Sequence, residues 1–337
     1  MKFTNLDHKV VLGICLILLI ACPAFIAASS DNLVGPKFSD PDKTQEMPEG
    51  WENQPIKYNK SAGKADLVVI TNRQIHQALL PIIKKYGKEN SLKITIDKGT
   101  CGVSGGGVSK KEIDLGVFCC PAGDTDRLPN LRFHTLGIMS IALLVHPENP
   151  IDDITIEQAR EIFQGNIFRW SELKDHKGNP GKKILIQPIG RLHCKKRPGH
   201  WRLLLDNSDL FSPDLQGVGA IPDMISLVAS NPGAIGYEVM QMVHEYQSKG
   251  KVKELKIGGL DPKDAQHLVS ADYPLYRTYN ITTWEGPHDK NPHAQKFVDM
   301  LLEEINHLDK KYGIIPASQL RQAGWKFKGN ELIGEPR

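Results

Sequence analysis

Side chains that can bind ligands or react are most concentrated in one segment, GRLHCKKRPGHWR, which spans residues 190–202. Five cations, two imidazoles and one thiol occur there: Arg191, His193, Cys194, Lys195, Lys196, Arg197, His200 and Arg202. Guanidinium groups hold oxyanions in a bidentate geometry, whereas thiolates and imidazoles bind soft or borderline metals. The segment predicts a loop that binds an anion or a metal, and a solvated hairpin tip at 195–197 is the alternative.

The cysteines divide into two groups along the chain. Cys15 and Cys22 lie in an apolar N-terminal run, and the others are Cys101, Cys119, Cys120 and Cys194. If the N-terminal run is removed, four cysteines remain in the mature chain. An even number of cysteines outside the cytosol favours disulfides.

The N-terminus has the pattern of a signal peptide. Lys2 and Lys9 precede an apolar stretch, and small residues then lead into polar sequence. We expect residues 1–28 to be this leader, with cleavage after Ala28, so the protein is periplasmic or otherwise exported. Retention of the run as a membrane anchor is the alternative, because its length is near the lower limit for a span.

Composition sets limits on the partners. The chain has 337 residues, enough for two domains, and a formal net charge of +3. So small a charge implies no polyanionic partner, and aromatic residues do not interleave with the basic ones, so nucleic acid is not an expected ligand.

The elements that must position these residues alternate between strand and helix. Residues 65–70 and 92–97 are short apolar runs typical of buried strands. Between them an apolar face at helical spacing ends near Gly87, which we expect to cap the helix. A glycine-rich turn, a short helix and the strand IDLGVFCC follow. Because each polar loop follows the carboxyl end of a strand, these loops are the expected ligand sites.

The second half of the chain continues the alternation. Thr155 and Gln158 have capping-box spacing at the start of a helix that Gly165 should end. Further strands are expected in KKILIQPIGR, after the turn at 231–233 and at 273–284, and an amphipathic helix at 293–307.

Five motifs occur in an order that resembles one family. They are GTCGVSGGG before EIDLGVFCCPA, then ITIEQAREIFQGNIFRWSEL, IGR before a polar loop, NPGAIGYE, and YPLYR. Together, over residues 64–325, the chain resembles the periplasmic phosphate-binding proteins of ABC uptake systems. The resemblance implies an α/β fold of the two-lobed periplasmic-binding-protein type (class II), with the ligand in a cleft between the lobes.

The resemblance also implies boundaries and a ligand set. Lobe one would comprise residues 64–145 plus 280–330, and lobe two 146–279, preceded by an arm or tether at 29–63. Four loops would face the cleft. Their expected ligand-binding residues are Thr71, Asn72, Arg73, Cys101, Gly102, Ser104, Gly105, Cys119, Cys120, Arg191, His193, Cys194 and Arg197.

The chain departs from the family pattern in these loops. Members line them with Ser and Thr hydroxyls, an Arg and an Asp, which accepts a hydrogen from protonated phosphate. Here the third loop reads VFCCPA, Cys101 stands in the second, and no acidic residue lies between Ile184 and Leu205.

Three interpretations of the cysteines stay open. Disulfides would tie the loops together. A Zn or Cu site would use Cys101, Cys119, Cys120, His193, Cys194 and His200. A thiol nucleophile would make the protein an enzyme. Covalent haem is not expected, because no Cys-x-x-Cys-His occurs.

The function expected from the whole sequence is non-catalytic binding of a small, phosphate-like anion. Binding energy would come from loop N–H groups, arginines and thiolates. We expect a monomer that works with an ABC permease in the membrane.

Overall fold

A computed structural model describes residues 37–192, 205 and 208–336 of the chain. The described strands are β1 (Leu67–Asn72), β2 (Ile94–Gly99), β3 (Leu115–Phe118), β4 (Leu131–Val145), β5 (Asp153–Ile154), β6 (Gln187–Gly190), β7 (Gln216–Gly217), β8 (Ala234–Val239), β9 (Lys253–Ile257), β10 (Tyr276–Trp284), β11 (Ile315–Pro316), β12 (Lys326–Lys328) and β13 (Glu331–Gly334).

The described α-helices are α1 (His76–Glu89), α2 (Cys101–Ser109), α3 (Ile156–Gln164), α4 (Ile221–Ser230), α5 (Met240–Glu245), α6 (Ala265–Val269), α7 (Ala294–Glu304) and α8 (Ala317–Gln322). Short 3-10 helices link them, among them Trp170–Glu172 and Ile305–His307. The α/β alternation expected from the sequence is therefore present.

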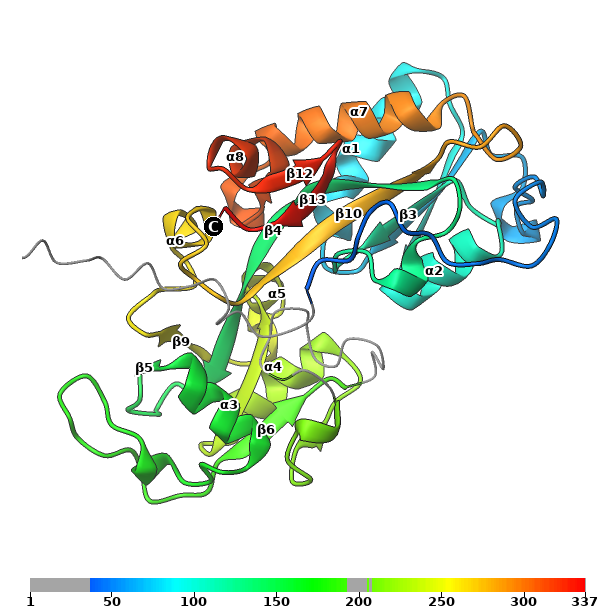
Figure 1. Cartoon of the computed structure of the whole chain (residues 1–337). Helices are drawn as coiled ribbons and strands as arrows, with labels where there is room; N and C mark the ends of the chain where they lie inside the picture. Colours follow the sequence, from blue (N-terminus) through cyan, green and yellow to red (C-terminus); the bar gives the residue numbers. More distant parts are fainter. Residues whose placement is uncertain (1–36, 193–204, 206–207, 337) are drawn as a thin grey trace, which may run out of the picture. The chain divides into compact units, whose positions relative to one another are not determined.

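The long strand β4 joins two groups of strands in one sheet, whose main path runs β2-β1-β3-β10-β4-β8-β6-β7. The first group comprises β1, β2, β3 and β10, and the second comprises β6, β7 and β8 together with β5 and β9. From Leu131 to Ser140, β4 pairs antiparallel with β10, with a bulge at Leu136. From Ile141 onward it pairs instead with β8, and from Leu143 also with β9. Figure 1 shows β4 and β10 running side by side from the region of α7 toward the region of β5 and β9. β4 is thus a member of both strand groups.

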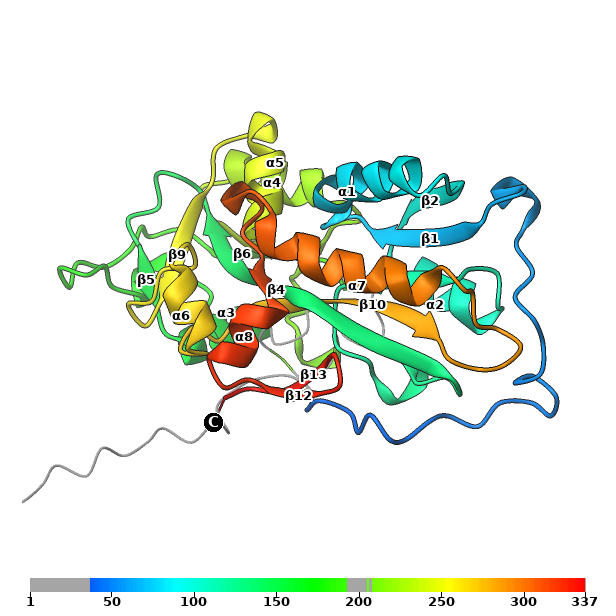
Figure 2. The same ribbon diagram turned by 90° about the horizontal axis from the view of Figure 1, so that it is seen from above.

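In the first group, helices cover both faces of the sheet. Leu67 and Val69 of β1 pack in one core with residues of α1 and α7. Val68 and Ile70 point the other way, into a core with Val108 of α2. Alternate residues of a strand face opposite sides, so a continuous apolar run is what a sheet buried on both faces requires. Figure 2 shows α7 and α1 along this group of strands.

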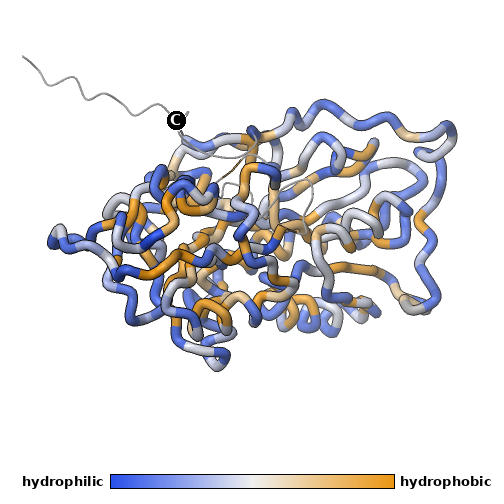
Figure 3. The backbone as a smooth tube through the Cα atoms, turned by 90° about the horizontal axis from the view of Figure 1, so that it is seen from below, coloured by the Kyte–Doolittle hydropathy of each residue, from blue (hydrophilic) through white to orange (hydrophobic). Residues whose placement is uncertain are grey.

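The second group is also covered on both faces. Ala142 and Leu144 of β4 pack against Met224 and Val228 of α4, whereas Leu143 packs in the core that holds the buried face of α3. Figure 3 shows that hydrophobic residues are concentrated in the inner segments and hydrophilic residues in the outer loops. Helix α3 has the expected ends: the Thr155–Gln158 capping box is formed, and Gly165 caps the helix at φ 88°.

Two local expectations were wrong. Gly87 does not cap the first helix, because α1 continues to Glu89 and Asn90 follows it. The glycine-rich segment after β2 is not a turn but the helix α2, which Thr100 caps by accepting from the Val103 N–H. Gly107 permits close packing of α2, because a Cβ there would lie 2.8 Å from Ile113 Cδ1.

The arm expected at the N-terminus lies, from residue 37, against the body that follows it (Figure 2). Trp51 is buried, its indole N–H donates to Ser109 O, and the Gln45 N–H donates to Arg127 O. The expected leader, 1–28, lies outside the described residues. Within the described part of the chain, none of the helices has the length and apolar character needed to cross a bilayer.

Candidate functional site

The ends of strands from both groups bring six polar side chains into one buried cluster. Asn72 ends β1, Cys101 begins α2 and Cys119 follows β3. The other three are Arg191, directly after β6, Glu238 on β8 and Arg277 near the start of β10. Cys101 is partly exposed, and the other five side chains are buried. We call this set, together with Gln74, the arginine–thiol network.

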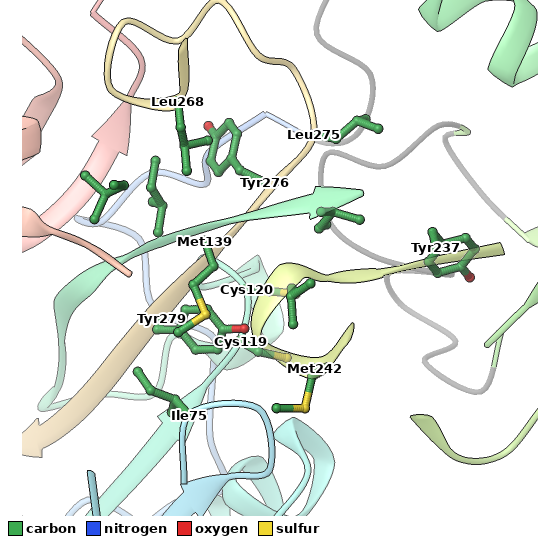
Figure 4. Packing of buried hydrophobic residues seen from close by; sticks show 14 of the residues in the cluster. Ile75, Cys119, Cys120, Met139, Tyr237, Met242, Leu268, Leu275, Tyr276 and Tyr279 are labelled. Carbon is green, nitrogen blue, oxygen red and sulfur yellow. The ribbon is translucent and has the colours of Figure 1, made fainter. Parts of the chain in front are cut away.

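Two thiols form one end of the network. The sulfur atoms of Cys101 and Cys119 lie 2.8 Å apart. The backbone N–H of Cys119 donates to Cys101 Sγ at 3.0 Å, and Asn72 Nδ2 donates to the same sulfur at 3.5 Å. Arg277 Nη1 lies 2.8 Å from Cys119 Sγ. Figure 4 shows Cys119 beside Tyr279, which lies on β10 like Arg277.

Gln74 links the two strand groups. Its side-chain oxygen accepts from Arg277 Nη1 at 2.8 Å and from the Tyr279 hydroxyl at 3.2 Å. Its nitrogen donates to Glu238 Oε1 at 2.8 Å, a contact between residues 164 positions apart. An amide can donate and accept at once, so Gln74 joins a cation of one group to a carboxylate of the other.

A buried ion pair forms the other end of the network. Arg191 Nη2 lies 2.6 Å from Glu238 Oε2, and the Glu238 side chain has no exposed surface. The Arg191 backbone N–H donates to the Tyr237 hydroxyl at 2.9 Å. Glu238 also accepts from the Val239 N–H through Oε1. The buried carboxylate of Glu238 is thus in contact with three donors: Arg191, Gln74 and the Val239 N–H.

Burial and contact shift the titration of two members. The hydrogen bond with Cys101 is the main cause that raises the pKa of the Cys119 thiol to about 12, so this thiol stays neutral at physiological pH. Burial raises the pKa of the Glu238 carboxyl, and Arg191 opposes that shift. The described network therefore combines two guanidiniums with one carboxylate.

A family model described as PBP superfamily domain matches residues 59–304. The chain belongs to the PBP superfamily. Among the relatives of this PBP-superfamily chain is the phosphate-binding protein PstS of Bacillus subtilis (strain 168), to which it is 25% identical over 315 residues. That alignment covers 91% of this chain and 94% of the relative.

Solved structures of the same fold support the architecture. One is a putative phosphate ABC transporter substrate-binding protein with bound phosphate from Clostridium perfringens, with a TM-score of 0.62 and 19% identity, over 74% of this chain and 98% of that one. Another is an ABC-type phosphate transport receptor from Vibrio cholerae, with a TM-score of 0.59 and 18% identity, over 74% and 99% of the two chains. The two-lobed α/β fold of the PBP type expected from the sequence is thus confirmed.

Four of the expected site residues of this PBP-superfamily chain, Thr71, Arg73, Ser104 and Gly105, are not members of the arginine–thiol network. Thr71 is buried, and its hydroxyl contacts His76 Nδ1 at 2.5 Å and Asp97 O at 3.0 Å. Arg73 is exposed, and its backbone N–H donates to Gly99 O. The Ser104 hydroxyl donates to Val117 O, so it faces the sheet. Gly105 follows Ser104 on α2, and a Cβ built on it would lie 3.8 Å from Cε1 of Phe118.

Other expected residues join the cluster. Asn72, Cys101, Cys119 and Arg191 belong to the arginine–thiol network, and Gly102 is the exposed second residue of α2. Cys120 is buried next to Cys119, and its carbonyl accepts from Asn280 Nδ2. Four further expected ligands lie outside the described residues: His193, Cys194, Arg197 and His200.

The disulfide and metal interpretations gain no support from the part of the chain that the structure describes. Cys101, Cys119 and Cys120 are in the thiol form there, without a disulfide among them. Among the same residues, no group of three or more His, Cys, Asp or Glu side chains is arranged to hold a metal ion. Cys194 lies outside the described residues, so a disulfide or a metal site that uses Cys194 is not tested by the structure.

Three members of the network were missed in the sequence. Gln74 lies in the loop at 71–74, which was expected to face the cleft, but it was not selected there, whereas Glu238 and Arg277 end NPGAIGYE and YPLYR, which were interpreted as marks of the fold. Glu238 and Arg277 are charged residues beside apolar strand residues, which is unusual for a buried position. A charged residue within an otherwise buried strand was the signal that could have found these two, and Gln74, in the turn after β1, has no such signal. The carboxylate that the sequence around Arg191 lacks is supplied by Glu238 of the distant strand β8.

Proposed function

We propose that this protein is a non-catalytic solute-binding protein that binds a phosphate-like oxyanion at the arginine–thiol network. The two strand groups joined by β4 would act as the two lobes, divided near 145 and 280. The protein would be exported and would deliver its ligand to an ABC permease in the membrane. The relatives named for phosphate binding support this choice of ligand.

The observation that carries the proposal is the clustering of two buried arginines with one carboxylate beside the start of α2. Arg191 is paired with Glu238, and Arg277 donates to Gln74 and Cys119. Each guanidinium is a planar fork of N–H donors, the geometry that binds an oxyanion through two parallel hydrogen bonds. Their meeting at the strand ends supports an oxyanion as the ligand.

The N-terminus of α2 adds backbone donors to the same place. Val103 N–H and Ser104 N–H are bound by Thr100, through its hydroxyl and its carbonyl. The N–H groups of Cys101 and Gly102 precede them in the first turn, where a helix has no carbonyl partners of its own. Those N–H groups and the positive end of the helix favour an oxyanion next to the sulfur of Cys101.

Glu238 supplies a means to distinguish phosphate from sulfate. A monoprotonated phosphate carries an O–H that donates to a carboxylate, and sulfate at neutral pH carries none. Burial raises the pKa of Glu238, and the Arg191 guanidinium at 2.6 Å opposes that shift; in its ionised form Glu238 would accept that hydrogen from phosphate and repel an unprotonated anion. The network therefore fits a hydrogen-bearing oxyanion best.

Calorimetric titration of the reduced full chain with inorganic phosphate and with sulfate tests the proposal. We expect saturable heat at one phosphate per chain and at least about tenfold weaker binding of sulfate. Arg191→Gln should weaken phosphate binding by about a hundredfold, because it also leaves Glu238 buried without its cation. Arg132→Gln is the matched control, since Arg132 forms an exposed pair with Glu285. Absence of heat at millimolar phosphate, or equal affinity for the two anions, would sink the proposal.

A further inference from the structure

The two thiols of the network have unequal surroundings. Cys101 is partly exposed in the first turn of α2, beside the exposed Gly102 and Val103. Cys119 is buried after β3, in contact with the Arg277 guanidinium. Of the two residues, Cys101 is therefore the more accessible to solvent.

The contacts of the two sulfurs also suit different chemical roles. Cys101 Sγ accepts from Asn72 Nδ2 and from the Cys119 N–H, which is the environment of a sulfur that acts as electron-pair donor. The pKa of Cys119 is raised to about 12, chiefly by its contact with Cys101. Once the Cys101 sulfur is bonded to another group it accepts a hydrogen bond less well, so it would shift the pKa of Cys119 less, and Cys119 would ionise more readily at the second step.

We propose that Cys101 and Cys119 form a reversible dithiol site that small disulfides modify. Cys101 is the attacking thiol, and Cys119 is the resolving thiol. The 2.8 Å contact between the sulfur atoms of the partly exposed Cys101 and the buried Cys119 is the juxtaposition that carries this assignment.

The reaction is a pair of thiol–disulfide exchanges with a small disulfide, RS–SR, as oxidant. The Cys101 thiolate attacks one sulfur, the S–S bond breaks and RS⁻ leaves, which gives a mixed disulfide. Cys119 then attacks the Cys101 sulfur, and its proton passes to the second departing thiolate. Two protein thiols lose two electrons and two protons in all, and RS–SR becomes two RSH.

Oxidation should strengthen binding of the anion, an inference that rests on the proposed function. In the reduced protein Arg277 Nη1 donates to Cys119 Sγ at 2.8 Å. A disulfide sulfur is a poorer acceptor than a thiol or thiolate, so Arg277 turns from sulfur to the ligand. Oxidation also removes any negative charge on Cys101, which would repel an anion. We expect about tenfold tighter phosphate binding in the oxidised form.

Peptide mapping by mass spectrometry tests the dithiol directly. The reduced full chain is equilibrated with oxidised and reduced glutathione at several ratios, alkylated in acid and digested. We expect a peptide linked through Cys101 and Cys119 that excess reduced glutathione removes. Cys120→Ala should keep the link, whereas Cys101→Ser and Cys119→Ala should each abolish it. Absence of the link in the native chain, or dominant links to Cys120 or Cys194, would overturn the assignment.

Phosphate titration of the oxidised and reduced native chain tests the coupling. Tighter binding by the oxidised form, with no such difference in Cys119→Ala, supports it. Equal affinities in a chain that carries the Cys101–Cys119 link refute the coupling. If neither form binds phosphate, the proposed function fails, and peptide mapping alone decides the dithiol site.

Discussion

Among the described residues, Lys111 and the two arginines of the arginine–thiol network are buried cations that are held in opposite ways. The Nζ of Lys111, which is 2% exposed, donates to Glu52 O, Gln54 O and Asp289 Oδ2 at 2.8 to 3.1 Å. It also lies 4.4 Å from the centre of the Trp51 ring. All three ammonium hydrogens have acceptors, and one carboxylate balances one charge. We call this site the lysine cage.

The arginine–thiol network is held differently from the lysine cage. Arg277 donates to a thiol, which is a weak acceptor, and shares the oxygen of Gln74 with Tyr279. The cage satisfies its cation with two carbonyls and a carboxylate and fastens the arm to the body. In the proposed function the network instead offers its guanidinium donors to an external anion, so the comparison sets a structural cation against ligand-binding ones.

Lys111→Met should have the largest effect on stability. It leaves Asp289, whose side chain is fully buried, without its cation, and we expect a loss of about 3 kcal/mol in the free energy of unfolding by urea titration. The double variant with Asp289→Asn should recover a large part of that loss, because no unpaired charge remains. A loss below about 1 kcal/mol for the single variant would show that the cage does not hold the arm.

Gln74→Leu should cost less, about 2 kcal/mol. The change removes the acceptor of Arg277 and the donor to Glu238 while preserving volume, so two buried groups lose one neutral partner each. Urea titration beside Lys111→Met measures the difference. If Gln74→Leu is as stable as the native protein, the link between the two strand groups contributes nothing to the fold.

Cys119→Ala should have the smallest effect of the three, and its dependence on alkaline pH distinguishes it from the loss of the Arg277 contact. The thiol ionises near pH 9 when unfolded, whereas its folded pKa is raised to about 12 by its contact with Cys101. Its contribution to stability is therefore complete below pH 9 and is lost as the pH rises toward 12. Between pH 8 and pH 10 the native protein should lose about 1 kcal/mol more than Cys119→Ala. Parallel pH profiles of the two proteins would refute the shift.

Sequence patterns predicted the fold better than the site, for a physical reason. Apolar periodicity and the Thr155–Gln158 capping box are local, so neighbouring residues alone were enough to identify strands and α3. The glycine-rich α2 was missed because its helix depends on the Thr100 cap and on packing against β3, not on helix propensity.

The site required contacts between distant parts of the chain. Cys101, Cys119 and Arg191 were selected for their chemistry, and the resemblance to a family placed their loops together. Gln74 and Arg277 contact each other across 203 positions, which no local spacing reveals. Their roles depend on register within β10 and on the turn after β1, so only the folded chain brings them together.

Phosphate calorimetry on two charge-site variants tests most directly whether the network, and not the cage, binds the anion. Arg277→Lys keeps the charge but loses the planar fork of donors, and we expect it to weaken phosphate binding by about tenfold. Lys111→Met, titrated at about 15 °C after circular dichroism confirms its fold, should bind within about twofold of the native chain. Native affinity in Arg277→Lys together with lost binding in folded Lys111→Met would contradict the account.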